Sequence, residues 1–429
     1  MNAQTLPKLG RSEPQLDSWR PWQLIAFRWL FVYLMLYSFD SFAEVLKIFD
    51  RLRDLCKPVS HTMTQAFAKA FLHVDIATFS SYSDDTYNFV QCLMFAITAT
   101  ISTVIWSIAA RKSSDHNRLL SWLRVVMQVH VGATVLSYGM AKVVPCQFPP
   151  LDAILLSQPV GEYSPQGLLW AVMGYSPLYT IFGGVTEVVA GFLLMLPATY
   201  LVGALLSFAV MVNVLMFNLS YDIGVKVLSF HLLLGAAVVF LPDLKGLLKL
   251  FFLQKPFSPA CYAALFNRPK FNKTAVIVQI VVALVWLGDQ TFANLNRYHR
   301  QYSVPTYAQD GIWIVEKQTV DGRDVANTDE ANLRWGRLSF TNKKLVIQNT
   351  AGTRFVCAID PDKAPIPVRQ DKVIVGTMTF VRSPVAPGHA VIEGTFADRK
   401  LSCQLTAVSI RELPLTRRSF RWIEDSREE

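Results

Sequence analysis

The chain has 429 residues, of which 52% are hydrophobic and only 17% are charged. A soluble protein of this length normally carries more charge, so the composition argues against a wholly soluble enzyme. The net charge of +9 does not indicate nucleic-acid binding, because Lys and Arg lie mainly in the connections between apolar blocks, where they orient a membrane protein.

Apolar blocks about 20 residues long, sufficient to cross a hydrocarbon layer of roughly 30 Å, fill the larger, N-terminal part of the chain. We expect residues 1–21 to form a polar tail and residues 22–293 to form a polytopic membrane domain. The first span should act as an uncleaved signal anchor, because the segment before it lacks a signal-peptide pattern. The predicted spans are 22–40, 86–110, 119–145, 177–197, 199–220, 223–242 and 274–293.

Three shorter stretches are apolar on one face or too short to span. Residues 43–55 and 63–74, after the first span, are amphipathic and are expected to lie on the membrane surface. Residues 166–175 cannot cross a bilayer and are predicted to form a re-entrant or interfacial helix.

Lys and Arg predict the orientation of the spans, since they are enriched in cytoplasmic connections. The segments before the first span, between spans two and three and between spans six and seven are basic, whereas residues 146–176 contain no Lys or Arg. The loop 41–85 is also basic and fits this pattern less well. We therefore predict an inner-membrane protein with a cytoplasmic N-terminus and with residues 294–429 on the periplasmic side.

Residues 294–429 alternate apolar and polar side chains in short runs separated by turn residues. This pattern predicts an all-β domain, either a sandwich or an up-and-down barrel. Gly311-Ile312-Trp313 resembles the Gly-x-Trp opening of lipocalin-type barrels. The predicted strands are 311–317, 333–340, 344–349, 353–359, 373–380, 390–396 and 401–408.

The spacing of histidine, cysteine and glycine predicts neither a metal nor a nucleotide. The sequence contains no His-x-x-x-His, no Glu-x-x-His and no paired Cys-x-x-Cys, and it has no phosphate loop or dinucleotide fingerprint. Cys357 and Cys403 both lie in the predicted outer domain, where they could form a disulfide or remain free thiols.

Ionisable side chains within the spans are candidates for function, because a charge at the bilayer centre costs about 2.5–3.5 kcal/mol. With alternating spans, polar side chains of spans three to six converge in or near the outer leaflet, which predicts a polar cavity open to the outside. Tyr138 shares a helical stripe with Lys142, and Asp222 is spaced to pair with Lys226. The converging side chains are Lys142, Glu187, Asn213, Asn218, Asp222, Lys226 and His231.

Structural roles compete with this interpretation. Lys142 and Lys226 can extend to the outer interface, and Arg124 to the inner one. Asn213 and Asn218 can form hydrogen bonds between helices, and the glycines around Glu187 can serve helix packing alone.

Short motifs within residues 119–242, together with two outside them, resemble the DoxX-like family of bacterial membrane proteins. The resemblance implies a four-helix membrane unit, and some members are linked to quinone-coupled sulfur oxidation or to thiol-stress complexes. The motifs are Ser137-Tyr138-Gly139-Met140-Ala141-Lys142, Gly183-Gly184-x-x-Glu187-x-x-x-Gly191, Tyr221-Asp222-Ile223-Gly224-Val225-Lys226 leading to His231, Asp84-Asp85-Thr86-Tyr87 and Phe420-Arg421-Trp422-Ile423.

This fold is also similar to the membrane part of vitamin-K-dependent carboxylases, where a lysine acts as base on a quinol. The resemblance therefore implies Lys142 as a base, with Glu187, Lys226 and His231 around it. The three extra spans and the β domain depart from the core family.

The leading hypothesis is a redox-linked membrane protein that binds a quinone or similar lipophilic molecule in the outer-leaflet cavity. A quinone-linked oxidoreductase is the enzymatic form of this hypothesis. Lys142, Glu187 and His231 would be catalytic, and Tyr138, Asn213, Asn218, Asp222 and Lys226 would bind the ligand. The alternative is a non-catalytic scaffold or assembly factor whose β domain binds a periplasmic partner. A transporter has less support, because no internal repeat or broken span is evident.

Overall fold

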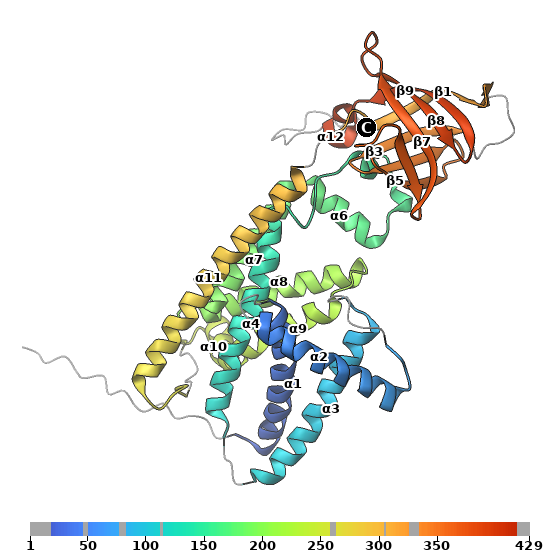
Figure 1. The fold of residues 1–429 in the computed structure, drawn as a ribbon. Coiled ribbons are helices and arrows are strands. Elements are labelled where there is room, and N and C mark those ends of the chain that lie inside the picture. The colour runs from blue at the N-terminus through green and yellow to red at the C-terminus, as the bar shows by residue number, and fades with distance from the viewer. Residues whose placement is uncertain are drawn as a thin grey trace, which may run out of the picture. The chain divides into compact units, whose positions relative to one another are not determined.

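The computed structural model describes residues 19–45, 50–76, 83–111, 115–257, 263–303, 306–325 and 334–417. Most of the predicted tail 1–21 and the motif at Phe420 therefore lie outside the described residues. The chain divides into two compact units, Met1–Gln147 with Leu178–Arg297 and Phe148–Pro177 with Tyr298–Glu429. Figure 1 shows helices in the first unit and mainly strands in the second.

Seven helices in the described ranges are long and apolar enough to cross a membrane, and each coincides with a predicted span. Helix α11 is longer than predicted, and α9 begins three residues later and continues through η4 (Leu241–Asp243) into α10 (Leu244–Leu253). The helices are α1 (Pro21–Val45), α3 (Thr86–Ala109), α4 (Asn117–Val143), α7 (Pro177–Met195), α8 (Tyr200–Ser220), α9 (Lys226–Phe240) and α11 (Pro269–Tyr302).

The amphipathic loop after α1 forms α2 (Asp50–Phe67), which continues as the π-helix η2 (Ala68–Leu72). Helix α2 crosses the gap between the two predicted amphipathic stretches, so they belong largely to one helix. Its predicted position on the membrane surface stays a prediction.

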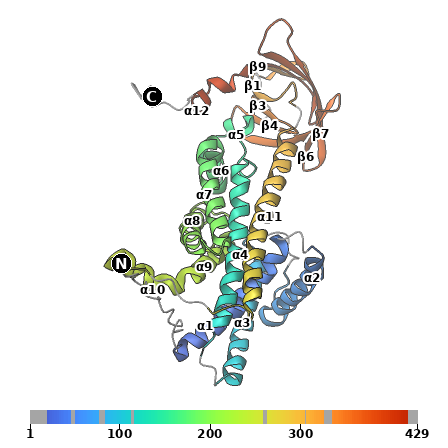
Figure 2. The same ribbon diagram turned by 90° about the vertical axis from the view of Figure 1, so that its left-hand side faces the viewer.

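Helix α4 is the centre of the helical unit. Two thirds of its apolar window is buried (67%), the highest share among the candidate spans. Its buried side chains Leu123, Met127, Val131 and Val135 join one apolar core with α1, α8 and α9. Figure 2 shows α11 alongside α4, where the Trp286 indole donates a hydrogen bond to a carbonyl of α4 at 2.9 Å.

The second unit contains a closed, eight-stranded antiparallel barrel, which confirms the barrel alternative over the sandwich. Neighbours in the sheet follow the chain order, and pairing of β1 with β9 closes it. The short β2 (Arg323–Asp324) extends the hairpin after β1. The barrel strands are β1 (Gly311–Val320), β3 (Trp335–Thr341), β4 (Lys344–Asn349), β5 (Arg354–Ile359), β6 (Ile366–Gln370), β7 (Val373–Arg382), β8 (His389–Phe396) and β9 (Arg399–Val408).

Large apolar side chains fill the barrel, as alternation along the strands predicts. Phe340 and Ile347 are at most 1% exposed. Trp313 of the Gly-x-Trp motif is buried, and its indole donates to the Gln309 carbonyl at 2.8 Å. The sequence did not indicate β6, because Pro365 and Pro367 weaken a strand pattern by removing backbone donors.

The suggested disulfide between Cys357 and Cys403 is not formed, and both are buried free thiols. Cys357 lies on β5 and Cys403 on β9, which are not neighbours in the sheet. Three strands separate β5 from β9 in either direction around the closed sheet, so backbone pairing does not bring the two cysteines together.

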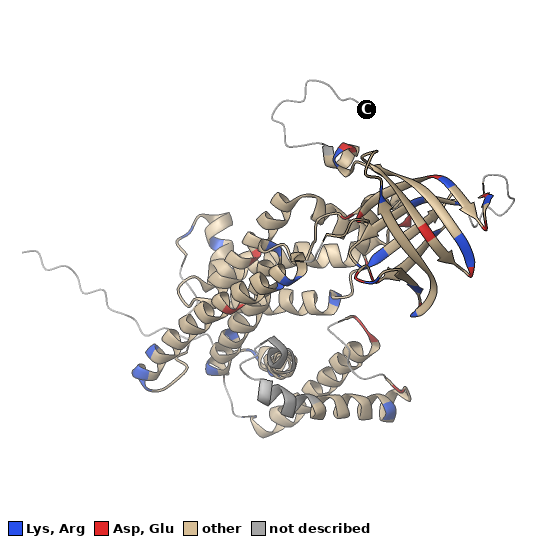
Figure 3. Ribbon diagram, turned by 45° about the horizontal axis from the view of Figure 1, so that its top comes forward, with Lys and Arg blue, Asp and Glu red and all other residues tan. Residues whose placement is uncertain are grey.

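The segment Phe148–Pro177, which we predicted as a loop of the membrane domain, clusters with the strands. It contains α5 (Ala153–Leu156), η3 (Val160–Glu162) and α6 (Pro165–Tyr175), which matches the short helix predicted at 166–175. The buried Ser339 hydroxyl of β3 donates to the Ser157 hydroxyl at 2.8 Å. Figure 3 shows charged residues along the strands of this unit, whereas the membrane helices carry few.

Candidate functional site

Lys142 of α4 and Glu187 of α7 form a buried ion pair. The lysine Nζ donates to both carboxylate oxygens of Glu187, at 2.7 Å and 2.6 Å. The two side chains are only 11% and 6% exposed. Each charge compensates the other, which a buried ionic group requires. Tyr138 lies one turn earlier on α4, and its side chain is partly exposed (36%).

Glycines bring α4 and α7 into backbone contact around this pair. A Cβ atom on Gly184 would lie 2.8 Å from the Gly139 carbonyl oxygen, and one on Gly191 would clash with Gly132. The packing role considered for the glycines therefore holds for Gly184 and Gly191. Gly183 has nothing within 4 Å of the corresponding position, so it makes no such contact.

The predicted pairing of Asp222 with Lys226 is present, at 2.8 Å between Oδ1 and Nζ. The hydrogen bond from Lys226 lowers the pKa of the exposed Asp222 carboxyl below its usual range. Asp84 is the group that sequence reasoning missed here: its carboxylate accepts from the backbone N–H groups of Lys226 and Val227 at the start of α9. A helix N-cap is recognised from the residues that directly precede the helix. Asp84 lies far from α9 in the sequence, so no local pattern connected the two.

The two asparagines have different environments. Asn218 is buried and donates through Nδ2 to the Ser229 hydroxyl at 3.0 Å, which joins α8 to α9. This contact agrees with the interhelical hydrogen bond considered from the sequence. Asn213, in contrast, is exposed on α8.

His231 contacts α1 and not the Lys142 pair. Its Nδ1 lies 2.7 Å from the Val227 carbonyl, so Nδ1 carries the proton and donates. Its Nε2 then accepts from the Tyr33 hydroxyl at 2.7 Å. The Tyr37 ring stacks on the imidazole with centroids 3.8 Å apart, and His130 of α4 meets that ring edge-on.

Sequence reasoning missed Tyr33 and Tyr37, because tyrosines in an apolar span look the same whether they face lipid or a histidine. His130 precedes Lys142 by 12 residues on α4. At about 1.5 Å of rise per residue, roughly 18 Å of helix separates the histidine–tyrosine cluster from the ion pair. Lys142 pairs with Glu187, Asp222 with Lys226 and His231 with Tyr33. Within the described ranges, no direct hydrogen bond or ion pair joins these three pairs into one cluster.

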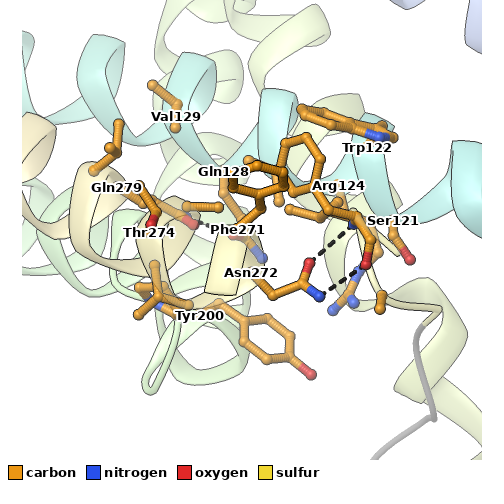
Figure 4. Close-up of a pocket in the computed structure, with 18 of the residues that line it drawn as sticks. Ser121, Trp122, Arg124, Gln128, Val129, Tyr200, Phe271, Asn272, Thr274 and Gln279 are labelled. Carbon is orange, nitrogen blue, oxygen red and sulfur yellow. Dashed lines mark hydrogen bonds between the residues drawn. The ribbon is translucent and has the colours of Figure 1, made fainter. Parts of the chain in front are cut away.

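A large cavity lies near the beginnings of α4 and α11, and none of the eight predicted site residues lines it. Its volume is about 940 Å³. Figure 4 shows aromatic and amide side chains around it, contributed by both helices and by Tyr200 of α8. The labelled lining residues are Ser121, Trp122, Arg124, Gln128, Val129, Tyr200, Phe271, Asn272, Thr274 and Gln279.

Two polar features mark the walls of this cavity. The side-chain Nε2 of Gln279 on α11 donates to the side-chain Oε1 of Gln128 on α4 at 2.8 Å, and both side chains are buried. Arg124 is buried as well, and its predicted extension to the inner interface stays a prediction. Its Nε donates to the Val239 carbonyl, and its terminal nitrogen lies 3.6 Å from the Asp243 carboxylate.

The signal for these residues was present but ambiguous. Amides in an apolar span indicate either helix pairing or a polar wall, and the choice depends on what the neighbouring helix presents. Within the described ranges, no group of three or more His, Cys, Asp and Glu side chains could hold a metal ion.

Comparison with known proteins shows one clear similarity. The chain is 31% identical over 123 residues to the uncharacterized protein YwoB of Bacillus subtilis, a match that covers 27% of this chain and 72% of that protein. That name states no activity. No family model matches the chain, and no solved structure matches it.

Proposed function

Because the chain belongs to the family of the uncharacterized protein YwoB of Bacillus subtilis, which has no stated activity, we propose a function from the cavity between α4 and α11. The protein is an integral membrane protein that binds a quinone or a similar lipophilic ring molecule in this cavity and takes part in a redox-linked process.

The cavity carries this proposal. Its volume of about 940 Å³ lies within the range of pockets for small organic ligands, roughly 300–1,000 Å³. Trp122 and Phe271 supply aromatic surface for a ring. The Gln128–Gln279 contact leaves the Gln128 amino group as a donor, which suits a quinone carbonyl.

The proposed location differs from the outer-leaflet cavity that the sequence suggested. Gln128 and Lys142 are 14 residues apart on α4, or roughly 21 Å along the helix. If the predicted topology holds, the cavity lies in the cytoplasmic half of the bilayer and the barrel on the periplasmic side. Catalytic roles for Lys142, Glu187 and His231 stay predictions.

Membership of a DoxX-like core remains part of the proposal. It is supported by the packing of α8 against α9 and of α4 against both. The Lys142–Glu187 pair also lies in two of the motifs that carried the resemblance.

Bound lipid extracted from the purified protein tests the proposal. We expect wild-type protein in mild detergent to release a quinone, detected by absorbance and mass spectrometry. Ala275→Phe fills the cavity and should abolish this, whereas Ile277→Phe, on an exposed position of the same helix, should not. Absence of quinone from wild type, or equal amounts in both variants, would refute the cavity site. Loss in Lys142→Ala with retention in Ala275→Phe would favour the outer-leaflet site instead.

The scaffold alternative is favoured by one observation, the mutual compensation of Lys142 and Glu187 at a glycine crossing. Such a pair holds helices in register without any ligand. A scaffold would yield no bound quinone, and its assembly with a periplasmic partner would survive Ala275→Phe but fail in Gly184→Leu.

A further inference from the structure

A second cavity lies at one rim of the β-barrel, within the strand-containing unit. Its volume is about 600 Å³. The start of β1, the connection from β7 to β8, the end of β9 and the helix η7 (Ile410–Glu412) surround it. None of its lining residues lines the cavity between α4 and α11, so the inference goes beyond the proposed function.

The ionisable side chains that line this cavity are mostly basic. Arg382 and Arg411 both line it, and neither forms an ion pair with a carboxylate in the described ranges. Other barrel cations do have acidic partners, such as Arg399 with Asp321 and Arg354 with Glu162. The cavity thus gathers two guanidinium groups that form no ion pair with a carboxylate in the described ranges.

Arg382 is held in place by contacts that leave its outer nitrogens available. Its Nε donates to the Ala308 carbonyl at 2.7 Å, and its guanidinium lies over the Trp313 ring, 5.6 Å from the centroid. A guanidinium oriented in this way loses little conformational entropy on binding an anion and can donate two parallel hydrogen bonds.

Asp310 is the acidic residue of the lining, and its carboxylate is already engaged. It accepts from the backbone N–H of Tyr307 at 2.9 Å and from that of Asn342 at 3.1 Å. These bonds fix the chain before β1 to the turn after β3. The carboxylate therefore serves the fold, and the arginines remain the dominant charge.

His389 adds a polar group with a defined tautomer. The Thr406 hydroxyl donates its single proton to the Glu316 carboxylate at 2.6 Å. The contact of 3.0 Å between that hydroxyl and His389 Nδ1 must then have the histidine as donor. Neutral His389 consequently carries its proton on Nδ1, and its Nε2 is free to accept from a ligand hydroxyl.

We propose that this rim cavity binds a small soluble anion bearing carboxylate or phosphate oxygens, with Arg382 and Arg411 as the anion ligands and His389 contacting a neighbouring hydroxyl. The size suits a small organic acid or a phosphorylated metabolite. The barrel interior is filled by side chains, so the rim is where such a ligand has room.

Isothermal titration calorimetry on the full-length protein in detergent tests this site, with inorganic phosphate and citrate as separate probes at constant ionic strength. At least one probe should bind saturably with one site per chain. Arg382→Gln and Arg411→Gln should each weaken binding at least tenfold. Arg323→Gln, an exposed arginine of the same barrel outside the cavity, should bind as wild type does.

Arg411→Gln keeps the test decisive if Arg382→Gln unfolds, because the Arg411 side chain forms no hydrogen bond or ion pair within the described ranges. A preference for citrate would identify a carboxylate ligand, and a preference for phosphate a phosphorylated one, both in support of the site. Saturable binding of neither probe, or equal affinity in wild type and Arg411→Gln, would overturn it.

Discussion

Lys142 and Glu187 are best understood from the cost of burying charge. Removing one partner of a buried pair leaves the other without compensation, whereas replacing both with apolar groups removes the charge altogether. The same pair would be a catalytic base and its neighbour if a ligand reached it. The two roles differ in how variants affect stability.

Lys142→Met should destabilise the helical unit by about 3–5 kcal/mol, because the Glu187 carboxylate remains buried and unpaired. Adding Glu187→Leu should recover most of the lost stability. Thermal unfolding in detergent of both single variants and the double variant measures this coupling. A loss below about 1 kcal/mol for Lys142→Met, the value typical of an exposed pair, would contradict burial of the pair.

The thiols of the barrel should be unreactive while it is folded. Burial raises the pKa of Cys403 to about 12 and also raises that of Cys357. We expect iodoacetamide at pH 8 to label both only after denaturation, as mass spectrometry of tryptic peptides would show. A peptide joined through Cys357 and Cys403 would contradict the separate thiols.

The same pKa shift predicts alkaline sensitivity of the barrel. Unfolded Cys403 has its ordinary pKa near 9, so between that pH and about 12 the folded state binds more protons than the unfolded state. The stabilisation is therefore full below pH 9 and decreases as the pH rises through this window. Cys403→Ala should reduce the pH dependence of the unfolding free energy in this window. An unchanged pH dependence would contradict the role of Cys403.

At the scale of elements, α4 and α7 show how a helix pair depends on side-chain size. The contact between Gly139 and Gly184 admits no Cβ atom without movement of the backbone. This close approach also helps to bury the ion pair, whose members lie three residues further along each helix. Hydropathy predicted both helices but could not choose between the adjacent glycines of the motif.

Gly184→Leu should therefore disrupt the membrane unit, while Gly183→Leu should leave it nearly unchanged. The physical reason is that position 184 faces α4 and position 183 faces open space. Yield of monodisperse protein in detergent and its melting temperature provide the measurement. Equal effects of the two substitutions would contradict the crossing.

The alternation of apolar and polar residues predicted most of the barrel strands but missed one. Alternation located seven of the barrel strands within a few residues, because side chains of a barrel point alternately inward and outward. Strand β6 was missed because Pro365 and Pro367 weaken its strand pattern, although Pro367 pairs with Thr377 of β7 in the sheet. Only the neighbouring strand determines whether such a segment is part of the sheet.

At the scale of the whole molecule, the second unit joins two segments that are far apart in sequence. One segment follows the third span and the other follows the seventh. With alternating spans, both odd-numbered spans end on the same face of the membrane. The seven-span count is therefore compatible with a single compact unit built from both segments.

Cysteine labelling tests on which side of the membrane the second unit lies. Val160→Cys and Val385→Cys, at exposed positions in the two segments, should both react with a membrane-impermeant maleimide applied from the periplasmic side. Arg111→Cys, in the connection between spans two and three, should react only after the inner membrane is opened. Protection of both valine positions would reverse the orientation, and opposite results for the two would contradict the compact unit.

The sequence by itself determined the number and approximate limits of the membrane spans, the class of the C-terminal domain and the pairs spaced for local contact, such as Asp222 with Lys226. These features depend on hydrophobic length and periodicity, which each segment carries within itself. Tertiary structure alone decided that Lys142 pairs with Glu187, that His231 faces Tyr33, and that a cavity lies beside Gln128. Those outcomes depend on which faces of distant helices meet, and that is a property of packing between segments that no single segment encodes.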